Sequence, residues 1–162
     1  MTFYENIDAP ERVLLISVDT GDFNAEESIE ELALLVETAG GEAVVTSTQK
    51  LPSVNPATYV GSGRIQEIAE ICRTNEIDLI VADDELSPAQ LKNIEDLTDT
   101  RVIDRTMLIL DIFALRARSS EGKLQVELAQ LKYSLPFLTG KGKSLSRLGG
   151  GIGTRGPGES KL

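Results

Sequence analysis

The chain has 162 residues, 41% of them hydrophobic and 4% aromatic, which suits one domain with an aliphatic core and an appendage. It lacks histidine and has one cysteine, so His-activated nucleophiles, His-ligated metal sites and an internal disulfide are excluded. No apolar run reaches the ~18 residues of a membrane span and no secretory signal precedes the first predicted strand, so we expect a soluble, cytoplasmic protein.

Charge is divided unevenly along the chain. Residues 1–100 hold 21 acidic and 5 basic side chains, whereas residues 101–162 hold 5 acidic and 11 basic ones. The overall net charge of −10 therefore combines an acidic body of −16 with a basic segment of +6. Such a division is typical of proteins whose basic part faces nucleic acid, although chance and helix-dipole preferences can also produce it.

The first predicted elements are a strand, a helix and a second strand. The apolar run 13–18 predicts a buried strand, and the β-branched run 43–48 predicts another. Between them, Asn24 with Glu27 three residues later predicts the start of an amphipathic helix, and Gly40 with Gly41 predicts its end.

The same alternation continues to residue 104. Gly61-Ser62-Gly63-Arg64 leads into a helix, and its apolar face consists of Ile65, Ile68, Ala69 and Cys72. A buried inert thiol is the expected state of Cys72. Residues 79–82 and 102–103 predict two short strands, and Ser87-Pro88-Ala89-Gln90 between them predicts a capped helix start. Residues 1–104 are thus predicted to form an α/β subdomain with a small parallel sheet flanked by helices.

The pattern changes at residue 105. Residues 105–138 predict one long helix of a helical arm, or two helices joined near Ser119-Ser120-Glu121-Gly122. Four leucines repeat at the 4-3-4 spacing of a coiled-coil seam: Leu124, Leu128, Leu131 and Leu135. A stripe this narrow needs a partner helix, so the chain looks incomplete, and self-association through the exposed leucines is expected as an alternative.

Residues 139–162 form a glycine-rich basic segment with eight glycines and five Lys or Arg side chains. Gly151 to Gly156 match the dinucleotide pattern G-x-G-x-x-G, but no strand precedes them. Gly142-Lys143-Ser144 resembles the end of a P-loop, but Phe137 occupies the position of its first glycine. Neither match is a nucleotide site. A flexible linker and an RNA-contacting loop remain equally compatible with this composition.

Three acidic residues follow predicted strands, namely Asp19 after the first and Asp83-Asp84 after the third. The carboxyl ends of parallel strands form the ligand-binding edge of an open α/β sheet. A small-ligand or phosphoacceptor site, similar to that of a receiver domain, is therefore an alternative function. A receiver carries an acidic pair after its first strand and a lysine after its last, where this chain has Asp19-Thr20 and Arg105. We favour roles as caps and turn residues. At Gly61 to Arg64, a tight turn is likewise favoured over an anion site.

The chain resembles the HflX family of GTPases in a series of motifs that occur in the family's order. These are YVGSGR at 59–64, DDELSPAQ at 83–90, VIDRT at 102–106, LDIFALRA at 110–117, EGKLQVELAQL at 121–131 and LGGGIGTRGPGE at 148–159. The resemblance implies a stress-related translation GTPase that binds the large ribosomal subunit and separates ribosomal subunits. It also implies an α/β subdomain followed by an antiparallel pair of long helices.

In such proteins a glycine-rich loop joins the two long helices and reaches toward rRNA near the peptidyl transferase centre. Mapped here, 108–135 is the first helix, 149–158 is the loop and Glu159 begins a truncated second helix. The implied ribosome-contacting residues are Arg147, Gly149, Gly150, Gly151, Gly153, Thr154, Arg155, Gly156 and Gly158, with Lys141 and Lys143. GTP and magnesium are expected only with the GTPase domain, which this chain lacks, so the chain alone is expected to be a non-catalytic binding module without cofactor or metal.

Overall fold

A computed structural model of the chain describes residues 9–139, and residues 1–8 and 140–162 lie outside this description. Its centre is one parallel sheet in the order β2-β1-β3-β4. The strands are β1 (Arg12–Asp19), β2 (Glu42–Lys50), β3 (Leu79–Ala82) and β4 (Arg101–Asp104). All of the neighbouring pairs are parallel, so the predicted α/β fold with a small parallel sheet is confirmed.

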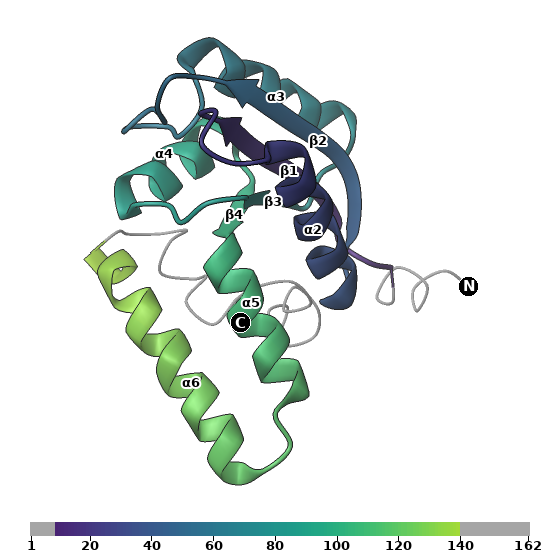
Figure 1. Cartoon of the computed structure of the whole chain (residues 1–162), viewed down its shortest axis with the longest axis vertical. Coiled ribbons are helices and arrows are strands. Elements are labelled where there is room, and N and C mark those ends of the chain that lie inside the picture. The colour runs from purple at the N-terminus through teal and green to yellow at the C-terminus, as the bar shows by residue number, and fades with distance from the viewer. Residues whose placement is uncertain (1–8, 140–162) are drawn as a thin grey trace.

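Helices cover both faces of this sheet (Figure 1). Because side chains alternate along a strand, Leu14 and Ile16 of β1 face one side, and Val13 and Leu15 face the other. The first side packs against α3 (Ser62–Thr74) and α4 (Pro88–Thr98), and the second against α2 (Ala25–Thr38) and α5 (Arg105–Arg116). The inner strands β1 and β3 are buried along nearly their whole length because helices cover both of their faces, and their buried positions are apolar apart from Ser17.

The helices begin where the sequence places their caps. The Asn24 side chain accepts a hydrogen bond from the Glu27 N–H at the start of α2. At the start of α4, Ser87 and Gln90 form a reciprocal capping box, with Pro88 at the first helical position. Side-chain oxygens that accept these N–H groups replace the intrahelical partners missing from a first turn.

The arm consists of two helices rather than one. After α5, Ala117 adopts an extended conformation, and the Ser119 side chain accepts from the Gly122 N–H to start α6 (Ser120–Ser134). A 3₁₀ turn, η1 (Leu135–Thr139), follows α6. The two helices lie side by side and run in opposite directions (Figure 1). One continuous helix is therefore wrong, because a serine cap within the predicted joint starts a second helix there.

Helix α6 has a half-buried face that packs against the rest of the molecule and an exposed face that carries the leucine seam. Val126, Gln130 and Tyr133 lie along the half-buried row, and Gln130 donates to the Asp111 carboxylate of α5. The predicted leucine seam forms another row. Leu124, Leu128, Leu131 and Leu135 are 65%, 51%, 54% and 57% exposed. The seam thus has no cover among the described residues. Within that same part of the chain, no helix has the length and apolar character needed to cross a membrane.

Candidate functional sites at the sheet edge and on the arm

The carboxyl edge of the sheet contains a topological switch point. β1 lies between β2 and β3, so the chain winds first to one side of β1 and then to the other. Open α/β sheets bind ligands at such a point. Asp19 ends β1, and Asp83 and Asp84 follow β3, so the structure places all three predicted acids at this edge.

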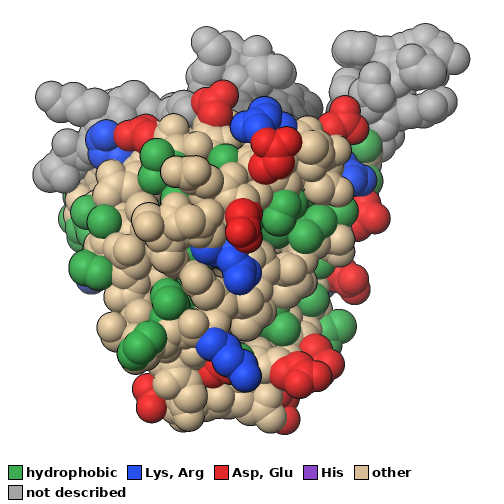
Figure 2. All heavy atoms as spheres, turned by 90° about the horizontal axis from the view of Figure 1, so that it is seen from above, with side chains coloured by type: hydrophobic (Ala, Val, Ile, Leu, Met, Phe, Trp, Pro, Cys, Tyr) green, Lys and Arg blue, Asp and Glu red, His purple; other side chains and the backbone are tan. Residues whose placement is uncertain are grey.

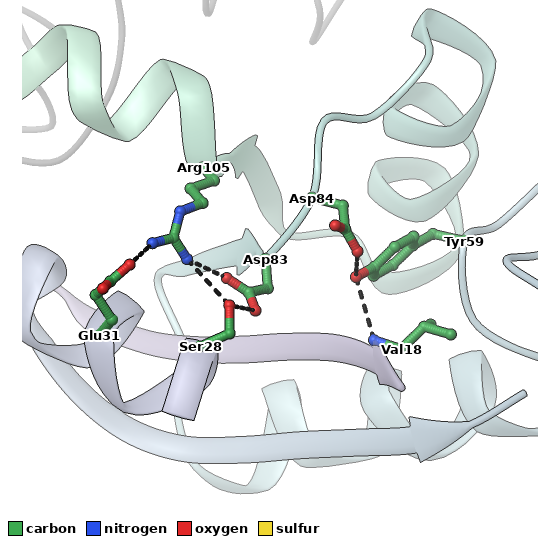
Figure 3. A network of polar contacts seen from close by, with 7 residues as sticks. All are labelled: Val18, Ser28, Glu31, Tyr59, Asp83, Asp84 and Arg105. Carbon is green, nitrogen blue, oxygen red and sulfur yellow. Dashed lines mark hydrogen bonds and ion pairs between the residues drawn. The ribbon is translucent and has the colours of Figure 1, made fainter. Parts of the chain in front are cut away.

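Asp83 is held by a network that joins three elements (Figure 3). Its carboxylate accepts from the Ser28 hydroxyl of α2 at 2.7 Å and from Nη1 of Arg105 at 2.6 Å. Arg105, the first residue of α5, also forms an ion pair with Glu31. The Asp83 side chain is only 1% exposed. Burial raises the pKa of this carboxyl group, while the bonds from Ser28 and Arg105 act in the opposite direction.

Asp84 points to the other side of β3 and is bound by Tyr59 (Figure 3). The Tyr59 hydroxyl donates to Oδ2 of Asp84 at 2.6 Å and accepts from the Val18 N–H at 3.2 Å. Burial, and then the hydrogen bond to Asp84, raise the pKa of Tyr59. Tyr59 has a φ of 67°, so its ring reaches the sheet edge from a left-handed backbone position. A role for Tyr59 at the sheet edge was not predicted from the sequence, although the residue begins the motif YVGSGR at 59–64.

Asp19 has a local partner as well. Its carboxylate accepts from the N–H of Gly21, which has a φ of 89°, so the acid stabilises the turn after β1. An open depression of about 420 Å³ lies here, between this turn and the end of β2, and Lys50 is among its lining residues. Within residues 9–139, no three His, Cys, Asp or Glu side chains are grouped to hold a metal ion. The geometry therefore agrees with cap, turn and network roles for the three acids.

A second buried carboxylate joins the sheet to the arm. Asp104, at the end of β4, is fully buried. Its Oδ1 caps α5 through the Met107 N–H, and its Oδ2 accepts from the Leu86 N–H and from the Tyr133 hydroxyl of α6 at 2.6 Å. Burial raises the pKa of Asp104, opposed by these three hydrogen bonds. Asp104 and Tyr133 were not singled out from the sequence, although a carboxylate between a strand and a helix is a usual cap.

Two further candidates lie in the α/β domain, namely the possible anion site at Gly61 to Arg64 and the Cys72 thiol, and both have structural roles. The Gly61 N–H donates to the Gln49 side chain, and Arg64 donates back to Ser47 and to the Thr48 carbonyl. These contacts tie the start of α3 to the end of β2, and Gly61 precedes the helix in an extended conformation. Cys72 is buried, and burial raises the pKa of its thiol, in agreement with an inert side chain.

The ribosome-contacting residues implied by the resemblance lie outside the described residues. They comprise Arg147, Gly149, Gly150, Gly151, Gly153, Thr154, Arg155, Gly156 and Gly158, together with Lys141 and Lys143. What the structure does describe is the point from which this segment departs. Phe137, in the 3₁₀ turn, is buried in the core beside Tyr133, with 6.0 Å between ring centroids. The chain therefore leaves the domain from an anchored position.

Comparison with known proteins covers both parts of this architecture. Residues 26–114 match the family described as "GTP-binding GTPase N-terminal", and residues 116–162 match "GTP-binding GTPase Middle Region". In solved structures, similar folds occur in a GTP-binding protein from the archaeon Sulfolobus solfataricus in complex with GDP. That chain has a TM-score of 0.60 and 36% identity over 80% of this chain and 38% of its own length. An SsGBP–GDP complex has a TM-score of 0.64 and 33% identity, over 83% of this chain and 38% of its own. A parallel sheet followed by a helical arm thus defines the N-terminal module of a class of GTP-binding proteins.

Curated relatives identify the family within that class. GTPase HflX of Lacrimispora saccharolytica is 58% identical over 94% of this chain and 36% of its own length. GTPase HflX of Escherichia coli is 45% identical over 98% of this chain and 37% of its own. The chain belongs to the HflX family of GTPases, and it spans little more than a third of the length of these relatives.

Proposed function

We propose that this chain is the N-terminal ribosome-binding module of an HflX-like GTPase that acts on the large ribosomal subunit in ribosome splitting under stress. The observation that carries the proposal is the family match over residues 116–162, which includes α6 and the whole glycine-rich basic segment. That segment combines glycines, which allow close backbone approach, with arginines, which pair with phosphate oxygens and stack on bases.

The module acts by placing its basic segment against rRNA and by electrostatic contacts, and it carries out no covalent step. The sheet domain and Phe137 fix the point from which residues 140–162 depart, and Asp104 fixes the arm through Tyr133. From that platform, Arg147 and Arg155 reach rRNA near the peptidyl transferase centre. Binding and hydrolysis of GTP with magnesium are assigned to the GTPase domain of the longer family members rather than to the residues discussed above.

Co-sedimentation with purified large ribosomal subunits across a salt series tests this proposal. The chain is expected to bind with an affinity that falls as salt rises, because phosphate contacts release counterions. Replacing Arg147 and Arg155 together by Ala should weaken binding and make the slope of log affinity against log salt shallower by about 1 to 2.

A matched control removes the same charge elsewhere. Arg73→Ala with Lys92→Ala eliminates two exposed cations of the α/β domain, which form local ion pairs with Glu70 and Asp96. This control should retain the wild-type slope. The loop assignment is overturned if the Arg147/Arg155 variant binds as the wild type does, or if the control loses as much.

A further inference from the structure

The tip of the hairpin formed by α5 and α6 carries three exposed cations. Arg116 ends α5, Arg118 lies in the connection and Lys123 lies in the first turn of α6. In Figure 1 this connection is at the end of the arm farthest from the sheet. Only one acidic residue, Glu121, occurs in the fifteen positions 112–126. We call Arg116, Arg118 and Lys123 the tip cations.

The tip cations differ in their partners from most of the other described cations. Five of the seven cations in residues 9–105 form an ion pair with a neighbouring carboxylate, namely Arg64, Arg73, Lys92, Arg101 and Arg105. The exceptions are Arg12, which donates to the Asn75 carbonyl, and Lys50. On the face of the α/β domain drawn in Figure 2, blue and red side chains accordingly lie interspersed. Among the residues that the structure describes, no carboxylate lies within ion-pair distance of any of the tip cations. Their charge is thus available to a partner.

The acidic body does not cancel this charge at the tip. α5 has 12 residues, which makes it about 18 Å long. At physiological salt the Debye length is about 8 Å, so the field of the carboxylates at the sheet edge is largely screened over that distance. A narrow basic tip can contact a polyanion at one point while the acidic α/β domain stays away from it. A flat anionic surface would instead come close to the acidic domain and be repelled by it.

An exposed aromatic side chain lies beside the cations. Phe113 is 54% exposed and precedes Arg116 by three residues, so the two side chains are neighbours on α5. Aromatic and guanidinium groups together stack on unpaired bases, while the cations contact phosphates. We propose that the hairpin tip is a second RNA contact, which binds phosphates through the tip cations independently of the glycine-rich segment. As a contact to rRNA, it rests on the proposed function.

The test replaces Arg116, Arg118 and Lys123 together by Ala in the 162-residue chain. Two probes are used, namely purified large ribosomal subunits and a short fluorescein-labelled RNA duplex, each in a salt series. If all three cations contact phosphates, the slope of log affinity against log salt should become shallower by about 2 to 3 for both probes. The matched control Lys50→Ala, Arg73→Ala, Lys92→Ala removes three exposed cations of the α/β domain and should keep the wild-type slope.

The outcomes separate this inference from the proposed function. If the wild-type chain binds the duplex but not the subunits, and the tip variant loses duplex binding, the tip contact is supported and the proposed function is overturned. If the tip variant binds subunits with the wild-type slope, the tip contact is overturned and the proposed function stands. The tip contact is also overturned if the tip variant loses binding to phosphatidylglycerol vesicles while its RNA binding is unchanged. Combining the tip and Arg147/Arg155 changes should give additive slopes, because distant contacts act independently. Circular dichroism should show unchanged helix content, since all three side chains are exposed.

Discussion

Asp83 lies at the edge where open α/β sheets bind ligands, but side chains of the same chain already bind its carboxylate. The carboxylate is buried and receives both a hydroxyl and a guanidinium donor, so a ligand or metal would have to displace Arg105. The strand ends made this position readable from the sequence. The donors were not readable, because Ser28 and Arg105 lie 55 and 22 residues away and meet Asp83 only through the packing of α2 and α5.

Arg105→Met should therefore destabilise the domain by leaving the Asp83 carboxylate buried without its cation. We expect a loss of about 2 kcal/mol in the free energy of unfolding at pH 7, below the usual cost of breaking a fully buried pair because Arg105 is partly exposed. The measurement is urea unfolding at pH 7 and again near pH 5.

The pH dependence of this loss has a definite sign. The folded pKa of Asp83 already lies above its ordinary value, and removing Arg105 raises it further. The folded variant then takes up a proton as the pH falls toward the ordinary Asp value of about 3.9, which removes the uncompensated charge. The loss should shrink near pH 5. Lys92→Met, at an exposed pair with Asp96, should cost under about 0.5 kcal/mol at both pH values. Equal losses for Arg105→Met at the two pH values would contradict the assignment.

At the scale of elements, local signals predicted more than long-range ones. Caps at Asn24 and Ser87 were visible because each acts within three residues of itself. The break between α5 and α6 was ambiguous, since Ser119 caps a new helix only if it leaves the helical conformation itself, as Ala117 and Ser119 both do in the structure. Periodicity found the leucine row of α6. It did not reveal that a second row, with Tyr133, faces the rest of the molecule.

Tyr133→Phe tests that second row. The change removes the hydroxyl that donates to Asp104 and keeps the ring against Phe137. A hydrogen bond to a buried carboxylate contributes about 1.5 kcal/mol or more, so the arm should separate from the sheet more often. Amide hydrogen exchange of α6 should accelerate by about tenfold, while that of β1 and β3 stays slow. Gln125→Ala, at an exposed site on the same helix and outside the leucine seam, serves as the control. Unchanged exchange in α6 of the Phe variant would show that the hydroxyl does not hold the arm.

Within residues 9–139, the molecule combines an acidic α/β domain, in which most cations are ion-paired, with an arm whose leucine seam and tip cations lack partners. The fold class followed from the alternation of strands and helices, because each element carries its own pattern. Contacts of the arm could not be predicted in the same way. The lack of ion pairs at Arg116, Arg118 and Lys123 is a property of the folded hairpin, and the charge of residues 101–162 only hinted at it.

The leucine seam predicts that the whole chain self-associates. Its four leucines are each more than half exposed and form a continuous apolar surface that favours association with a second helix. If two copies of this chain pair through it, sedimentation should depend on concentration, and Leu128→Glu should abolish that dependence by placing charge in the seam. Leu128 contributes little to the domain itself, because α6 has no fully buried residue, so thermal stability should stay close to that of the wild type. Leu34→Glu is the matched control, since Leu34 is 64% exposed on α2 and lies outside the arm. The seam is not the contact if Leu128→Glu sediments as the wild type does, or if both variants lose association equally. In either case association has another source.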